Sequence, residues 1–223
     1  MTAMAAENVP RRTTGHRDTR RRMIDSAVAL LRERSATGVT VDAVLARSGA
    51  PRGSVYHHFP GGRDQIVLEA VAVAGRYVAE LIARSEAGGD PSAVVRRFLD
   101  FWERMLLDSD YLAGCPVVSL TVDSRADQPD AIKLVEEIFL LWQSRLRSVL
   151  VSSGIEVSRA RRLATMIVAA AEGAVLLSRA QRSLEPLHDV CDELGALIEA
   201  AAKPTEIYPT RRTICTTPRS GFS

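Results

Sequence analysis

Apolar residues recur three and four positions apart from residue 18 to about residue 202 of this 223-residue chain. That spacing is typical of amphipathic helices, and no stretch shows the strict alternation that favours a strand. We therefore predict an all-α fold with about nine helices. In chain order they cover residues 18–34, 41–48, two turns from residue 51, 63–84, 90–108, 117–124, 129–151, 158–182 and 186–202.

These helices predict two domains. Two short helices at residues 41–48 and from residue 51, which the apolar stripe of the helix at 18–34 can cover, suggest a small head at residues 18–64, and the remaining helices suggest a larger helical body at residues 65–202. Residues 1–17 have no apolar period and carry three arginines, so we expect a flexible basic arm, with a merely solvated tail as the alternative. Residues 203–223 are rich in Pro and Thr and are expected to be disordered.

The second and third short helices have the sequence features of a helix-turn-helix. Thr40 suits the N-cap of the second helix, Gly49 suits the turn, and Pro51 suits the start of the third. Val55 and Phe59 stand four residues apart and can anchor the third helix in a core. Its remaining face, which is basic and aromatic, is then free to meet a partner.

Two sequence motifs carry a resemblance to a known family. The run from residue 19 to residue 72, with GVTV at 38–41 and SVYHHFPGGR at 54–63, resembles the N-terminal domain of the TetR family of bacterial repressors. The paired glycines of the second motif and AGCP at 113–116 are similar to the branch that includes the LmrA and YxaF regulators of multidrug and flavonoid response. The resemblance implies a homodimer that binds an operator in double-stranded DNA and releases it when a small ligand enters the body.

Charge also points to nucleic acid. From residue 10 to residue 63 the chain has eleven arginines and four acidic residues, a formal charge of +7, whereas the whole chain carries only +2. Arginine and hydroxyl groups bind phosphates, and small residues at a helix start permit approach to bases. We predict that Arg52 reads a base, most simply a guanine, and that His58 points inward. The predicted DNA-binding residues are Thr40, Arg52, Gly53, Ser54, Tyr56, His57, Gly62 and Arg63.

The body offers large apolar side chains and few charges near them. Aromatic and methionine side chains supply adaptable apolar surface, although core packing is the alternative for each. Together with the resemblance to a ligand-responsive family, they predict a cavity for a small, lipophilic, mostly uncharged and aromatic effector. The candidate ligand-binding residues are Phe101, Trp102, Met105, Cys115, Phe139, Trp142, Gln143, Met166 and Glu172.

Small residues on the helix at 158–182 suit close packing of helix on helix. They are Ala169, Ala170, Gly173 and Ala174. In TetR-like proteins the last two long helices build the dimer interface, so the resemblance implies that this surface pairs with a second copy; packing within one chain is the alternative. We expect the last helix to contribute Leu187, Val190, Leu194, Leu197 and Ile198.

We expect no metal and no cofactor. The three cysteines form no C-x-x-C pair, and the adjacent His57 and His58 would point about 100° apart on a helix. The most apolar window, at residues 163–177, is short and contains Glu172, and no apolar leader precedes the head. These features predict a cytoplasmic protein with no membrane span.

Two other functions stay open from the sequence, as does activation in place of repression. Cys115 precedes a short helix whose N-terminus could activate its thiol, which would suit a redox or electrophile sensor that binds DNA. A buried, inert thiol is the alternative. A thiol or serine enzyme is less well supported, because the chain lacks G-x-S-x-G, a P-loop and a dinucleotide fingerprint. We therefore expect no enzymatic activity.

Overall fold

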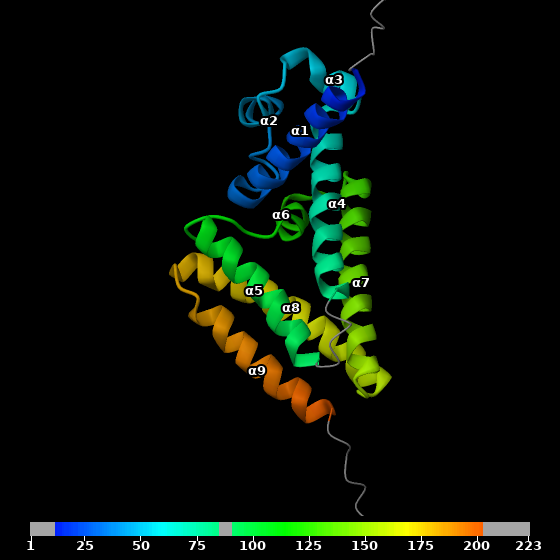
Figure 1. Cartoon of the computed structure of the whole chain (residues 1–223), viewed down its shortest axis with the longest axis vertical. Helices are drawn as coiled ribbons and strands as arrows, with labels where there is room; N and C mark the ends of the chain where they lie inside the picture. Colours follow the sequence, from blue (N-terminus) through cyan, green and yellow to red (C-terminus); the bar gives the residue numbers. More distant parts are fainter. Residues whose placement is uncertain (1–11, 85–90, 203–223) are drawn as a thin grey trace, which may run out of the picture.

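A computed structural model describes residues 12–84 and 91–202, which form nine α-helices and one short 3-10 helix (Figure 1). No strand occurs in these two ranges, and the prediction of an all-α fold is confirmed. The predicted disordered tail and most of the predicted basic arm lie outside the described residues.

The head consists of three helices and the 3-10 helix η1. They are α1 (Arg12–Arg34), α2 (Val41–Ser48), η1 (Arg52–Ser54) and α3 (Val55–His58). Because α1 begins six residues earlier than predicted, residues 12–17 of the expected arm are helical. The third helix is also different: Pro51 is extended and precedes the helical residues, and the amide of Ser54 donates to the Pro51 carbonyl at 2.9 Å. This i to i+3 bond makes the first turn 3-10.

The buried apolar side chains of the head belong to one continuous core with those of the body, and α1 packs against α2 and α4. Val55 and Phe59 are fully buried, as their spacing predicts, and His58 is buried beside them. From α1 the buried side chains include Met23, Ile24, Ala27 and Leu31. This packing fixes which face of α3 points outward.

The body contains the remaining six helices. They are α4 (Gly62–Ala83), α5 (Pro91–Asp108), α6 (Pro116–Asp123), α7 (Pro129–Ser152), α8 (Val157–Gln181) and α9 (Glu185–Ala202). α4 descends from the head and runs beside α7, while α5, α8 and α9 form the lower part of the molecule (Figure 1). Glu156 caps α8, because its carboxylate accepts from the amides of Ser158 at 2.7 Å and Arg159 at 2.9 Å.

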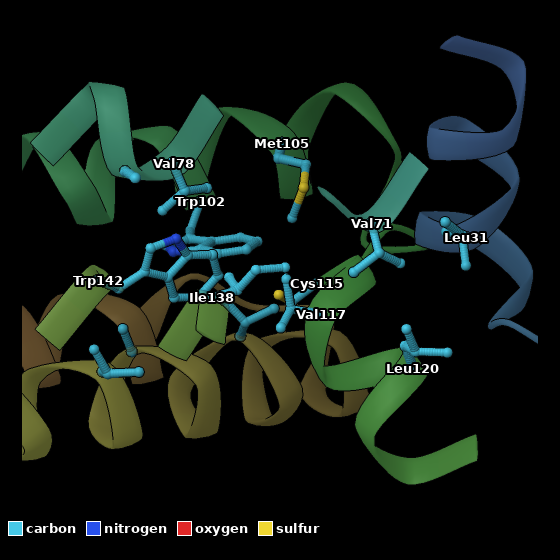
Figure 2. Close-up of a cluster of buried hydrophobic side chains, with 14 of the residues drawn as sticks. Leu31, Val71, Val78, Trp102, Met105, Cys115, Val117, Leu120, Ile138 and Trp142 are labelled. Atoms are coloured by element: carbon cyan, nitrogen blue, oxygen red, sulfur yellow. The ribbon is translucent and has the colours of Figure 1, made fainter. Parts of the chain in front are cut away.

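Two tryptophans occupy the centre of the body. Figure 2 shows Trp102 of α5 and Trp142 of α7 in the same buried cluster as Ile138, and both rings are fully buried. The indole of Trp142 donates to the Gly75 carbonyl at 2.8 Å. A side chain at Gly75 would lie 2.7 Å from Ile138 Cδ1, so this glycine is what lets α4 and α7 approach so closely.

Candidate functional site

Two local signals build the helix-turn-helix. The hydroxyl of Thr40 accepts from the amide of Ala43 at 3.1 Å and caps α2 as predicted. Gly49 then takes the left-handed conformation, with φ +65°, and its amide donates to the Leu45 carbonyl at 3.0 Å. Because a side chain is strained in that conformation, glycine ends α2 sharply and turns the chain toward α3.

The outer face of η1 and α3 presents most of the predicted DNA-binding residues to solvent. Arg52, Gly53, Tyr56 and His57 are exposed, with 68% of Tyr56 accessible, and a Cβ added at Gly53 would meet nothing within 4 Å. Ser54 is half-buried, and its hydroxyl donates to the Pro51 carbonyl at 2.6 Å. The helix therefore begins with an open backbone flanked by one cation and two aromatic rings.

Arg52 is held by a neighbour that the sequence reasoning did not identify. Its guanidinium donates to the Asp42 carboxylate of α2 at 2.6 Å, and both side chains are largely exposed. An exposed ion pair contributes little to stability, so a phosphate or a base edge can replace Asp42 at small cost. The signal in the sequence was an acidic residue in the first turn of α2, directly after the Thr40 cap.

The start of α4 is a less suitable anion site than predicted. The guanidinium of Arg63 donates to the carbonyls of Val39 at 2.7 Å and Ala36 at 2.6 Å, and so holds the turn between α1 and α2. The amide of Gly62 is buried and donates to the Phe59 carbonyl at 2.8 Å. These bonds argue against phosphate contacts from the Gly62 amide or the Arg63 side chain.

The candidate ligand-binding residues do not surround one cavity. Phe101 and Met105 line a groove of about 690 Å³ between α1, α4 and α5. Cys115 and Glu172 line a separate hollow of about 380 Å³ between α1, α6 and α8. Gln143 lies in a third, on the outer surface of α7 and α8.

The four remaining candidates line none of these three hollows. Trp102 and Trp142 are packed core, and Phe139 is half-buried with its ring centroid 5.5 Å from that of Trp142. Met166 is exposed on the outer face of α8. For the two tryptophans, the alternative of core packing therefore fits the structure. The candidate residues do not line one aromatic cavity, as expected, but are divided among several separate hollows and the core.

Cys115 is buried at the N-terminus of α6, with 7% of its surface exposed (Figure 2). Burial, followed by the nearby Glu172 carboxylate, raises the pKa of the Cys115 thiol well above its ordinary value. A thiol that stays protonated is a poor nucleophile. The geometry thus favours the inert alternative over an oxidant sensor.

Glu172 is buried in the middle of α8. Burial raises the pKa of its carboxyl group to about 7, and a hydrogen bond with Cys115 opposes that shift. Arg32 and Arg179 line the same hollow. The folded protein therefore holds a proton that the unfolded chain releases near pH 4.5, and the stability of the fold falls as pH rises from that value toward 7.

We expect Glu172→Gln to stabilise the protein by about 1 to 3 kcal/mol at pH 8 and to change little at pH 4. The amide has nearly the same shape and carries no charge, so it removes the cost of ionising a buried carboxyl group. Urea unfolding of both proteins across this pH range measures the difference. Stability curves that stay parallel from pH 4 to pH 8 would contradict a buried, proton-linked carboxyl group.

Two further observations concern metals and membranes. Within residues 12–84 and 91–202, no group of three or more His, Cys, Asp or Glu side chains is placed to hold a metal ion. By length and composition α8 is the one helix of the described chain that could cross a bilayer, although half of its most apolar window is buried against the rest of the fold. Core helices of soluble proteins have the same character.

Comparison with known sequences matches both domains. Residues 23–70 match the family model of bacterial regulatory proteins of the tetR family, and residues 91–193 match that of the C-terminal domain of LmrA/YxaF-like transcriptional regulators. The chain is 38% identical to an uncharacterised HTH-type transcriptional regulator, Rv0196, of Mycobacterium tuberculosis, over 81% of this chain and 94% of that protein. It is 30% identical to the HTH-type transcriptional regulator LmrA of Bacillus subtilis, over 76% and 91% respectively.

Solved structures share the fold. A TetR regulatory protein from Rhodobacter sphaeroides matches with a TM-score of 0.73 at 23% identity, over 80% of this chain and 97% of that one. A TetR transcriptional regulator from Chloroflexus aurantiacus matches with a TM-score of 0.68 at 26% identity, over 83% and 96%. The sequence motifs, the helix-turn-helix and these relatives agree: the chain belongs to the TetR family of bacterial transcriptional regulators and has an LmrA/YxaF-like C-terminal domain.

Proposed function

We propose that this DNA-binding regulator is a homodimeric repressor that grips an inverted-repeat operator with two heads and is released by a small molecule bound in the body. The observation that carries the proposal is the exposed face of η1 and α3, where Arg52, Tyr56 and His57 flank the open backbone of Gly53. The names of two relatives of this chain describe them as transcriptional regulators. This supports a regulatory rather than an enzymatic role, in the cytoplasm.

In this proposal the head divides its contacts by chemistry. Tyr56 and His57 donate to phosphates and fix the register of α3, while Gly53 lets the backbone lie close to the base edges. Arg52 leaves Asp42 and donates to a guanine in the major groove. Thr40 stands exposed at the start of α2, where the adjacent helix N-terminus favours a phosphate.

The dimer interface is proposed on the outer face of α8. Met166, Leu176 and Leu177 are exposed there, and Ala169 and Gly173 continue the same face at spacings of three and four residues. The contribution expected from α9 is smaller than the sequence suggested. Leu187, Leu194 and Ile198 are buried within their own chain, so only Val190 and Leu197 stay partly accessible.

The effector acts through a difference in affinity. A ligand releases DNA only if it binds more tightly to the head spacing that does not fit the operator, and by linkage DNA then weakens ligand binding by the same factor. Phe101 and Met105, in the groove between α1, α4 and α5, offer apolar surface at the junction of head and body. A lipophilic molecule seated there would contact elements of both domains.

Operator release by candidate ligands, in reducing and in oxidising buffer, tests the proposal. The duplex is one selected from random sequences by the protein itself. We expect a lipophilic ligand to weaken DNA binding by about 5- to 150-fold in reducing buffer. Release that needs oxidant and is abolished by Cys115→Ser would replace the proposal with the sensor alternative, and no release in either buffer by any ligand would contradict ligand response.

A further inference from the structure

The hollow between α1, α6 and α8 is distinct from the groove beside α5, although Arg32 and Glu33 line both. Its volume is about 380 Å³, within the range of small-molecule sites. It opens where the last turn of α1, which belongs to the head, meets the body. Its lining includes the carboxylates of Glu33, which is paired with Arg47, and of Asp123, which accepts from the Thr37 amide. Four other polar residues, Arg32, Ser119, Glu172 and Arg179, line it beside an apolar wall that includes Val118 and Val175.

Each of these four polar residues has a buried atom with no hydrogen-bond partner among the described residues. The atoms are Arg32 Nε, Ser119 Oγ, Glu172 Oε1 and Arg179 Nε. Glu172 itself is more than nine-tenths buried and uses its other side toward Cys115. Because buried polar groups in native proteins are almost always bonded, four such atoms around one hollow point to a polar ligand.

Gly114 contacts the backbone of one of these arginines and lies close to the side chain of the other. Its amide donates to the Arg32 carbonyl at 2.9 Å, and a Cβ at this position would lie 2.6 Å from Arg179 Nη1. Neither guanidinium forms an ion pair with a described carboxylate. Burial lowers the pKa of Arg32, and the nearby Cys115 and Tyr77 oppose that shift. Its guanidinium also lies 6.0 Å from the centroid of the Phe101 ring.

We propose that this hollow binds a small organic carboxylate with an apolar body, such as an aromatic acid. The two guanidinium groups of Arg32 and Arg179 would hold the carboxylate, since arginine matches its planar geometry. Ser119 and the protonated form of Glu172 would donate further hydrogen bonds, and the valines would cover the apolar part. This inference rests on the proposed ligand response and changes the expected effector from an uncharged molecule to an anion.

The position suits a signal between domains. The Gly114 amide bond to Arg32 lies at one edge of the hollow, and the amide of Thr37 donates to the Asp123 carboxylate of α6 at 3.1 Å near the other. Both bonds join the head to the body. A ligand between α1, α6 and α8 would contact the head directly and favour one of its orientations over the other.

The test uses the full-length dimer with three sodium salts, benzoate, 2-naphthoate and octanoate, each compared with its primary amide. Calorimetry is expected to show one site per protomer for at least one carboxylate below about 1 mM, with the amide binding at least about 10-fold more weakly. Arg179→Met should weaken binding of that carboxylate by at least about 10-fold, and Arg179→Lys should weaken it by less. Arg104→Met removes an arginine from the neighbouring groove beside α5 and is the matched control, with unchanged binding.

The outcomes separate this inference from the proposed function. Binding that is as tight to Arg179→Met as to the wild type, or no carboxylate binding up to about 1 mM, overturns the anion site. If a carboxylate binds through Arg179 without weakening operator binding, the site stands and ligand-driven release fails. If neutral aromatic compounds release the operator from wild type and Arg179→Met alike, release stands and the anion site falls.

Discussion

Gly173→Arg is expected to convert the dimer to a monomer and to lower operator affinity by at least about 100-fold, because two linked heads lose their avidity. Gly173 lies half-buried on the outer face of α8, and a Cβ added there meets nothing within 4 Å of its own chain. The substitution therefore leaves room for the protomer to fold. Between two copies the same arginine would place bulk and an unpaired charge in a closely packed surface.

Sedimentation at micromolar concentration measures the change in assembly, and circular dichroism checks that the helices remain. Leu107→Arg is the matched control, since it places the same side chain at an exposed apolar position of α5, outside the residues of the proposed interface. It should leave the dimer intact. A Gly173→Arg protein that sediments as a dimer would remove α8 from the interface, and a monomeric wild type would remove the interface altogether.

Arg52→Ala is expected to weaken operator binding by about 1 to 3 kcal/mol and to relax base preference at one position of each half-site. The side chain is 82% exposed and its only described partner is Asp42, so its removal leaves the fold of the head unchanged. Competition between the selected duplex and single-base variants measures the preference.

Arg47→Ala is the control for charge alone. Arg47 also belongs to the head, but both of its terminal nitrogens bond to the Glu33 carboxylate at 2.9 Å, on the side of α2 that faces α1. Its loss should change affinity little and leave the preferred sequence unaltered. An Arg52→Ala protein with full affinity and the wild-type preference would show that another element reads the bases.

Local sequence signals predicted the fold well because each acts over a few residues. The Thr40 cap, the left-handed Gly49, and the spacing of Val55 and Phe59 each stabilise one turn or one face, whatever the rest of the chain does. The helix ends of the body follow for the same reason, since Pro91, Pro116 and Pro129 mark three of the starts.

Long-range contacts decided what the sequence could not. The guanidinium of Arg63 donates to carbonyls that lie 24 and 27 residues earlier in the chain. No local sequence pattern indicates that this arginine holds the turn between α1 and α2. Apolar periodicity also does not say which partner a face meets: Leu187, Leu194 and Ile198 pack inside the chain, whereas Met166 is exposed. The position of a hollow depends on several helices at once. The sequence therefore could not show that Cys115 and Glu172 line one hollow and Phe101 and Met105 another.

Selection of duplexes from a random pool, followed by binding of the enriched duplex at several salt concentrations, tests most directly that two heads of one dimer bind DNA. The protein should enrich an inverted repeat, whose affinity falls steeply with salt because many phosphate contacts release counterions. Removing one half-site should cost most of the affinity. Enrichment of a single, unrepeated site, or binding that is insensitive both to salt and to the loss of a half-site, would contradict the account.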